Sequence, residues 1–359
     1  MAGQGVVVID LGSGSVKAGL KGGSSPSCIL TEKNQKSVLN GGKYPIEKGL
    51  VTNWEDFEQL LRNTFTELGV KPEENVVLLS QPMTNTQLNK EKIVQVLFER
   101  LNVPAVFLAY TNVLSLYCTG RLNGVVMESG AGVSNCVAIY QGYAMLDSVV
   151  SSDLTGKQLT NYISQKLNNP GLDFETVDEI KKATTGFTPA TEDKSYTLPD
   201  GSSVTVVPNE QRAPEILLDP SLANMDTPSI PQAIVDCIEK VRTKHGEERA
   251  KELYDNIVLS GGNTDFTGLD SRVEDIIKSR MEGVSGIKVT KAAQCSAWIG
   301  GSILGSHDTF GDIILTRAEY DKEGAQAIEM QILILDVSAC RECQSLINTF
   351  ETLEATVCD

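Results

Sequence analysis

The sequence predicts an α/β protein built from two related halves. Short apolar strand patterns alternate with longer helical patterns along its 359 residues, which is typical of sheets covered by helices. A strand, an acidic residue, a short Gly/Ser turn and a second strand occur twice, at residues 6–20 and 124–142. Two copies of one plan suggest a duplicated domain with a ligand between the copies. Two unrelated β-hairpins would explain the same residues, because glycine-rich turns are common.

The expected elements follow this alternation in order, from the spacing of apolar residues. Expected strands cover residues 6–10, 17–20, 76–79, 106–109, 124–128, 134–140 and 257–259. Expected helices cover residues 54–68, 90–101, 157–167 and 231–254. The charged stretch 240–251 lies inside the last helix, and we expect it to lengthen that helix into solvent.

The charge balance favours protein partners. Lys and Arg total 31 against 47 Asp and Glu, which gives a net charge of -16. Such a surface repels the phosphates of nucleic acids and anionic lipids, so we expect partners with basic segments, no direct nucleic-acid contact and no membrane. No apolar run reaches the roughly 18 residues that cross a bilayer, and no signal-peptide pattern precedes Val6. We therefore expect the cytoplasm, with the nucleus as an alternative.

The 8 cysteines are scattered and are expected to be reduced thiols. Cys340 and Cys343 form a C-x-x-C pair. A zinc site there would need two further ligands, and only His245, His307 and the nearby Cys358 could supply them. A lone C-x-x-C pair is weak evidence for a metal or redox function.

The two turns have the composition of phosphate-binding loops. Glycine accepts backbone angles that other residues resist, so several backbone N–H groups can converge on one phosphate. Lys17 could add a positive charge, and Asp10 and Glu128 precede the turns as a pair of carboxylates suited to Mg²⁺ held partly through water. Alternatively, Asp10 caps its own turn and Lys17 is a solvated surface lysine. The turn residues are Gly12, Ser13, Gly14 and Ser15 in the first copy, and Gly130, Ala131, Gly132 and Val133 in the second.

A third segment, residues 258–269, runs from a strand through Gly261 and Gly262 into polar residues that open a helix. Adjacent glycines would let an adenosine approach the backbone closely. Together with the two turns, this segment favours a nucleotide cleft.

Five longer segments resemble actin and occur in the order that they have there. They cover, with gaps, residues 5–325. Because they lie partly outside the phosphate-binding elements that actin shares with Hsp70 and the sugar kinases, they argue against a sugar or acetate kinase. The segments are KYPIEKGLVTNWEDFE (43–58), NVLSLYCTGRLNGVVMESG (112–130), SYTLPDG (195–201), LYDNIVLSGG (253–262) and SAWIGGSIL (296–304). The chain is thus similar to a divergent actin-related protein.

The resemblance implies an actin-like two-lobed α/β fold, with duplicated ribonuclease-H-like domains around a nucleotide cleft. The outer lobe would be residues 1–118 and 296–359, and the inner lobe 119–295, with its upper part at 155–225. The upper outer subdomain, which in actin carries the loop that grips the next protomer, would be reduced to a stub at 25–42.

Two further segments have open interpretations. The tail 331–359 has no actin counterpart. It would either pack on the outer lobe or form a partner-binding helix that fills a groove. The loop 222–230 matches one that bridges strands in actin filaments, and would be either a lateral contact or a plain surface loop.

The resemblance also implies ATP or ADP with Mg²⁺ as the cofactor. The binding residues would be both turns, Lys17, Lys181, Gly261, Gly262, Asn263 and Phe266, with the metal at Asp10 and Glu128. The departures from actin lie in the same cleft. Thr111 and Asn135 stand where actins have the Gln and the His that position the attacking water. Ala131 stands in place of an acid within the second turn, and Lys182 in place of a Glu that binds ribose. Gln294 and Cys295 stand in place of a Lys and a Tyr of the cleft. Without the water-positioning side chains we expect nucleotide to bind with little or no hydrolysis, or the cleft to be empty.

The missing gripping loop opposes self-polymerisation. The sequence therefore predicts a subunit of a cytoskeletal or motor-associated complex, with actin or actin-related subunits as partners and a place in the cytoplasm and cytoskeleton. A divergent filament-forming actin ATPase is one alternative. A nuclear subunit of a chromatin remodeller is another, although no basic import run is visible.

Overall fold

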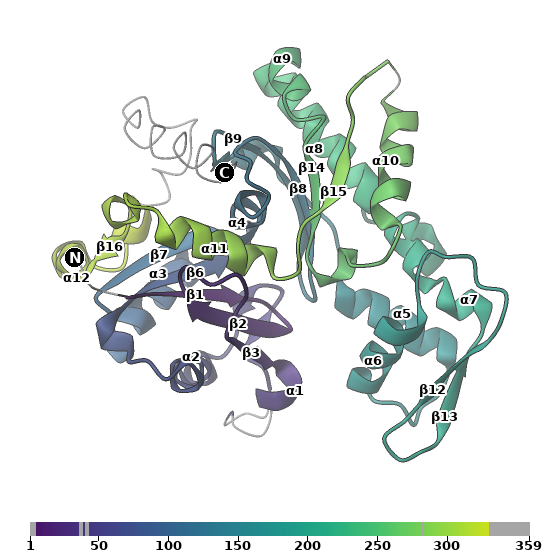
Figure 1. The fold of residues 1–359 in the computed structure, drawn as a ribbon, viewed down its shortest axis with the longest axis horizontal. Helices are drawn as coiled ribbons and strands as arrows, with labels where there is room; N and C mark the ends of the chain where they lie inside the picture. Colours follow the sequence, from purple (N-terminus) through teal and green to yellow (C-terminus); the bar gives the residue numbers. More distant parts are fainter. Residues whose placement is uncertain (1–4, 36–38, 40–42, 282, 330–359) are drawn as a thin grey trace.

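The computed structural model describes residues 5–35, 39, 43–281 and 283–329. Two sheets of six strands dominate the described chain (Figure 1), and helices cover them, so the predicted α/β class is confirmed. We call the described residues up to 118 and from 296 onward the outer lobe, and those between them the inner lobe. The predicted tail 331–359, with Cys340 and Cys343, lies outside the described residues, as does part of the stretch 25–42.

The outer lobe contains a mixed sheet in the order β16-β7-β6-β1-β2-β3. β1, β6 and β7 are parallel, while β2, β3 and β16 are antiparallel to their neighbours. The strands are β1 (Gly5–Leu11), β2 (Ser15–Leu20), β3 (Cys28–Thr31), β6 (Asn75–Gln81), β7 (Ala105–Tyr110) and β16 (Leu315–Thr316), with a small pair β4 (Ile46–Glu47) and β5 (Leu50–Val51). The helices are α1 (Glu32–Gln35), α2 (Trp54–Leu68), α3 (Gln87–Gln95), α4 (Thr111–Tyr117), α11 (Ser296–Ser306) and α12 (Arg317–Glu323).

The inner lobe repeats the plan around a second sheet, in the order β10-β9-β8-β14-β15 with β11 beside β9. The strands are β8 (Gly124–Ser129), β9 (Ser134–Tyr140), β10 (Tyr143–Ala144), β11 (Val150–Ser151), β14 (Ile257–Ser260) and β15 (Val289–Lys291), with a separate hairpin β12 (Lys194–Thr197) and β13 (Ser203–Val206). The helices are α5 (Gly156–Leu167), α6 (Phe174–Thr184), α7 (Pro208–Gln211), α8 (Ile230–His245), α9 (Glu247–Lys251) and α10 (Leu269–Arg280). In Figure 1, α5, α6, α7 and the β12–β13 hairpin project to the lower right as one unit.

Alternating residues of the strands divide the core into layers. Val7 and Ile9 of β1 face α2 and α3, whereas Val6 and Val8 face the layer shared by both lobes. That shared layer also contains residues of the inner sheet and of the helices α4 and α11, which lie between the sheets. Trp298 of α11 is fully buried there and donates its indole N–H to Val8 O at 3.1 Å. Burial of this layer therefore holds the two lobes together.

The expected helix over 231–254 is wrong in one respect. α8 ends at His245, and Gly246 has φ of 91°, a conformation that side-chain-bearing residues resist. A separate helix, α9, begins at Glu247. The charged stretch 240–251 thus covers the end of α8, the break at Gly246 and α9, rather than lying in one long helix. Within the described ranges, no helix is both long and apolar enough to cross a membrane.

Candidate functional site

The two predicted Gly/Ser turns have the same hydrogen-bond pattern. In the first turn, between β1 and β2, Gly12 N donates to Ser15 O at 3.1 Å. In the second, between β8 and β9, Gly130 N donates to Val133 O at 2.8 Å. Each turn thus closes over four residues at the end of an equivalent strand, as a duplicated origin predicts.

The two turns touch at the boundary of the lobes. A Cβ atom at Gly132 would lie 2.6 Å from Ser13 Cβ, and one at Gly14 would lie 2.9 Å from Ala131 Cβ. Side chains at these positions would push the turns apart, so glycine is needed for the close approach. Ser13 Oγ also accepts the backbone N–H of Gly49 at 2.9 Å.

Asp10 is held by two partners at the end of β1. Lys17 Nζ donates to its Oδ2 at 3.1 Å, and Ser80 Oγ donates to its Oδ1 at 2.7 Å. The charge of Asp10 is the main cause that raises the pKa of Lys17, against the opposing effect of burial. Lys17 is therefore held in the site by Asp10 rather than being a free surface lysine.

Three polar residues form a row across the inner sheet beside the turns. Ser260 of β14 is the register partner of Glu128 of β8, which is in turn the partner of Asn135 of β9. Ser260 Oγ, Glu128 Oε2 and both amide atoms of Asn135 are buried, and have no hydrogen-bond partner in the described part of the chain. Buried polar atoms usually have partners, so this row is suited to water, a metal ion or a polar ligand.

The ionisation of Glu128 reflects this environment. Burial, and then the charge of Asp10, raise its pKa to about 8, while Lys17 opposes the shift. The carboxyl group is therefore largely neutral at pH 7. A divalent cation beside it would favour the charged form, so Asp10 and Glu128 fit a Mg²⁺ site that needs further oxygens from water or phosphate. The described residues contain no cluster of three or more His, Cys, Asp or Glu placed around one metal ion.

Thr111 and Asn135, which stand where actins have the residues that position water, differ in their hydrogen bonding. Thr111 begins α4, and its Oγ1 donates to Gln81 O at 2.8 Å. Asn135 is fully buried in the polar row, and its amide atoms have no hydrogen-bond partner within the described ranges. Neither side chain can accept a proton as an imidazole can.

The third predicted segment lies directly against the second turn. Gly261 has φ of 86°, and a Cβ there would lie 2.4 Å from Ser129 O. A Cβ at Gly262 would have no heavy atom of the described residues within 4 Å. Asn263 Nδ2 donates to Ser129 Oγ at 3.0 Å, and its Oδ1 is buried without a hydrogen-bond partner among the described residues. Gly262 is thus the open position that an adenosine could approach.

Other predicted residues are engaged within the inner lobe. Lys181 donates to Gly156 O, Thr160 Oγ1 and Asp178 Oδ1, so a nucleotide contact would require it to exchange one of these partners. Burial is the main cause that lowers its pKa. Lys182 pairs with Asp178.

The remaining positions lie beside the site. Phe266 packs edge-on against Phe187, with ring centroids 6.0 Å apart. Gln294 Nε2 donates to Asp265 Oδ2 at 2.8 Å. Cys295, in a left-handed conformation, precedes α11, and burial raises its pKa. The roles of these three residues in binding a nucleotide stay predictions.

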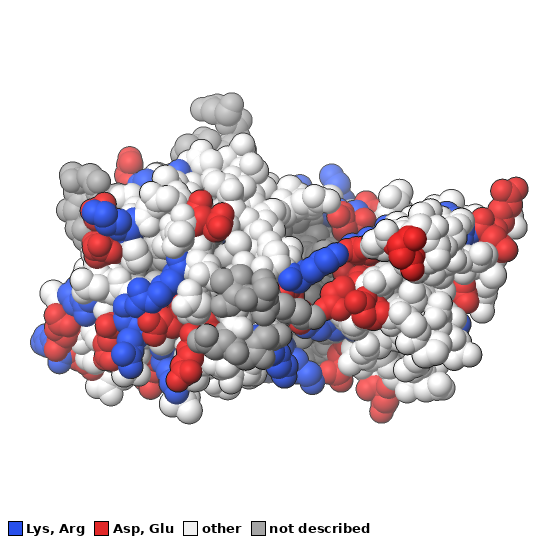
Figure 2. Space-filling view, turned by 90° about the horizontal axis from the view of Figure 1, so that it is seen from below, with Lys and Arg blue, Asp and Glu red and all other residues white. Residues whose placement is uncertain are grey.

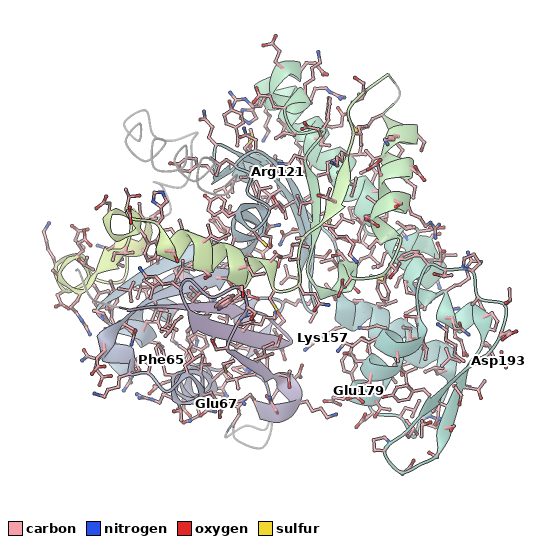
Figure 3. All side chains as sticks on the ribbon, in the orientation of Figure 1. Phe65, Glu67, Arg121, Lys157, Glu179 and Asp193 are labelled. Carbon is pink, nitrogen blue, oxygen red and sulfur yellow. The ribbon has the colours of Figure 1, made fainter. Side chains whose placement is uncertain are left out.

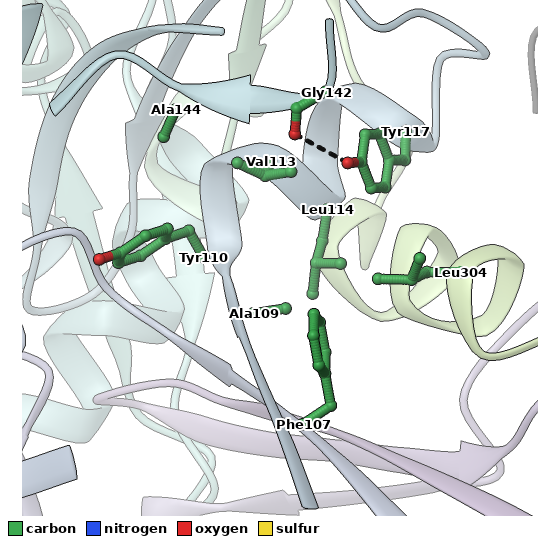
Figure 4. A pocket seen from close by; sticks show the side chains of 9 residues that line it. All are labelled: Phe107, Ala109, Tyr110, Val113, Leu114, Tyr117, Gly142, Ala144 and Leu304. Atoms are coloured by element: carbon green, nitrogen blue, oxygen red, sulfur yellow. Dashed lines mark hydrogen bonds between the residues drawn. The ribbon is translucent and has the colours of Figure 1, made fainter. Parts of the chain in front are cut away.

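Ser80 and Ser260 belong to the site but were not predicted from the sequence. Each ends or nearly ends an apolar strand at the edge where the turns lie, and that position was the signal that could have identified them. A separate apolar hollow lies among β7, α4, β10 and α11 (Figure 4). Tyr117 lines it and donates its hydroxyl to Gly142 O at 2.8 Å.

The family model for actin matches residues 1–191 and 175–332, which is most of the chain. The chain belongs to the actin family. Its two sheets, each with a Gly/Ser turn at the lobe boundary, agree with that membership. Actin-family proteins generally bind a nucleotide with Mg²⁺.

Proposed function

We propose that this actin-family chain is an assembly subunit that holds ATP or ADP with Mg²⁺ and hydrolyses it slowly or not at all. The observation that supports it is the pairing of two touching turns with a buried row of polar atoms that have no hydrogen-bond partner in the part of the chain that the structure describes. Backbone N–H groups of the turns would hold the phosphates, with Lys17 adding positive charge. Asp10 and Glu128 would hold the metal, and Mg²⁺ would neutralise phosphate charge.

Slow hydrolysis follows from the side chains at the reacting end. Phosphoryl transfer to water depends on orienting the water in line and on stabilising the developing charge. Thr111 is short and already donates to Gln81 O, and the Asn135 amide is not a base. The turns can hold a polyphosphate without either residue, because they bind through the backbone.

A structural role in a complex is supported by two features of the sequence. The resemblance to actin implies that only residues 25–42 stand in place of the subdomain whose loop grips a following protomer, and the net charge is -16. We therefore propose partners that are actin or actin-related subunits, or motor and cytoskeletal components with basic segments, in a cytoplasmic, cytoskeletal complex.

The first experiment measures the nucleotide content and the association state of the purified full chain. The protein is denatured, and the released nucleotide is resolved by anion exchange. We expect ATP or ADP at about one per chain, and no pelleting of filaments when Mg-ATP is added. A protein that carries and rebinds no nucleotide would remove the nucleotide part, and filaments would favour the alternative of a filament-forming ATPase.

Restoring the side chains that resemblance assigns to actin should increase hydrolysis. We expect the double variant Thr111→Gln/Asn135→His to hydrolyse bound ATP at least about tenfold faster than the original protein, since each positioned group contributes at least that much. Single-turnover release of phosphate measures this rate, and Thr197→Gln on the exposed strand β12 serves as the control. An unchanged rate in a double variant that still binds ATP would show that these positions do not limit hydrolysis.

A further inference from the structure

Two ion pairs connect α1 of the outer lobe to the upper part of the inner lobe. Lys157 Nζ lies 3.0 Å from Glu32 Oε2, and Lys33 Nζ lies 2.7 Å from Glu179 Oε1. The paired residues are 125 and 146 positions apart in the sequence. Figure 3 shows Lys157 and Glu179 on the side of the inner lobe that faces α1. Figure 2 shows basic and acidic side chains meeting over the hollowed boundary of the lobes.

The outer partners are fixed to the first turn. Glu32 N donates to Gly14 O at 3.1 Å, so the residue that supplies the carboxylate is bonded through its backbone to that turn. α1 is also anchored on α2, where Asn63 Nδ2 donates to Gln35 Oε1 at 3.0 Å. Any movement of α1 away from the inner lobe therefore moves the first turn with it.

The inner partners are fixed to the second turn in the same way. Lys157 N donates to Ala131 O at 2.9 Å. Glu179 lies on α6, and α6 is fastened to α5 by the bonds of Lys181 to Gly156 O and Thr160 Oγ1. Thus Glu32 and Lys157 pair with each other through their side chains, while their backbones each hold one of the two turns.

We propose that Glu32 and Lys157, supported by Lys33 and Glu179, are positioning residues that hold the two turns together and slow the release of a polyphosphate bound there. This inference rests on the proposed function for its ligand, but the contact between the turns can be measured without one. The side chains of Glu32 and Lys157 pair with each other, and only their backbones bond the turns, so they act by keeping the lobes closed over the ligand.

The size of the effect follows from exposure. The side chains of Lys157 and Glu32 are 34% and 29% exposed, whereas those of Lys33 and Glu179 are 68% and 41% exposed. A partly exposed pair changes an equilibrium by about two- to fivefold, and a more exposed pair by less, with both reduced by salt. Lys157 also acts on Glu47, whose pKa is lowered first by Lys43 and then by Lys157, so losing Lys157 removes two attractions.

The experiment reverses one charge at a time and then exchanges both. Release of a fluorescent ATP analogue with Mg²⁺ is followed after a chase with unlabelled ATP, and hydrogen exchange of the turn amides is measured in nucleotide-free protein. Glu32→Lys and Lys157→Glu should each accelerate release about two- to fivefold and raise amide exchange in residues 130–133. The exchange of charges, Glu32→Lys/Lys157→Glu, should return both quantities to within about twofold of the original protein.

The control is the ion pair of Lys71 and Glu74, which is 67% and 62% exposed and lies away from the turns. Lys71→Glu should leave release and exchange unchanged. The proposal is refuted if Glu32→Lys and Lys157→Glu leave the hydrogen exchange of the turn amides unaltered. It is also refuted if the double variant does not return release and hydrogen exchange toward the original values. If the original protein binds no nucleotide, the proposed function fails, yet the exchange measurements still decide whether the pair holds the turns.

Discussion

Replacing Gly300 with alanine is expected to destabilise the protein by about 3 kcal/mol or more, although alanine is the better helix former. Gly300 lies within α11, and a Cβ there would lie 1.8 Å from Leu114 O and 2.6 Å from the carbonyl carbon of Leu114. Both contacts are with the backbone of α4, so no side-chain rotation relieves them. α11 and α4 would have to separate within the layer shared by both lobes.

Equilibrium unfolding in denaturant measures this effect, with two other glycines as matched controls. A Cβ at Gly301 would meet Val8 Cγ1 at 2.7 Å, which is a side-chain methyl group that can shift. A Cβ at Gly311 meets nothing within 4 Å. We expect the loss of stability to fall in the order Gly300→Ala, Gly301→Ala, Gly311→Ala. A Gly300→Ala protein within about 1 kcal/mol of the original would show that the two helices can separate at low cost.

The sequence predicted helices well where a capping residue stands at each end of the helix. The helix expected at 54–68 is α2 (Trp54–Leu68), because Asn53 accepts the N–H groups of Glu55 and Asp56, and Gly69 ends the helix in a left-handed conformation. The expected helix at 231–254 failed because apolar spacing continues past Gly246, while the backbone there does not. The spacing of apolar residues indicates which face of a helix is buried. It does not indicate that one residue, here Gly246, changes the backbone angle and ends the helix.

The site could be predicted only in part for a similar reason. The turns and the acids before them are contiguous in the sequence, so Asp10, Glu128 and the glycines could be identified from composition. The row of Ser260, Glu128 and Asn135 depends on strand register, and the pair of Glu32 and Lys157 on the packing of distant helices. The bonds of Lys181 to Gly156 and Thr160 were equally invisible, because they depend on how α5 packs against α6.

Changing Glu128 to glutamine is expected to stabilise the metal-free protein at alkaline pH. The carboxyl group has a pKa of about 8 in the folded state against 4.5 in the reference state. Between these values the folded protein binds one more proton than the unfolded chain, so the free energy of unfolding decreases as the pH rises from about 4.5 to about 8. Above about 8 both states have lost the proton and the difference stays constant. The full effect is at most about 5 kcal/mol, and glutamine, which does not ionise, avoids it.

The measurement is the unfolding free energy of both proteins with EDTA present, at about pH 5 and about pH 9. Near pH 5 the neutral carboxyl group and the amide have similar size and polarity, so the two proteins should be nearly equal; near pH 9 Glu128→Gln should be the more stable. Glu73→Gln, at an exposed position, should show no such divergence. Added Mg²⁺ with ATP should narrow the gap at high pH, because a cation beside Asp10 stabilises the charged Glu128 and cannot do so for an amide. A gap that is the same at both pH values would mean that Glu128 does not change its protonation in this range, and that the carboxylate already has a compensating partner.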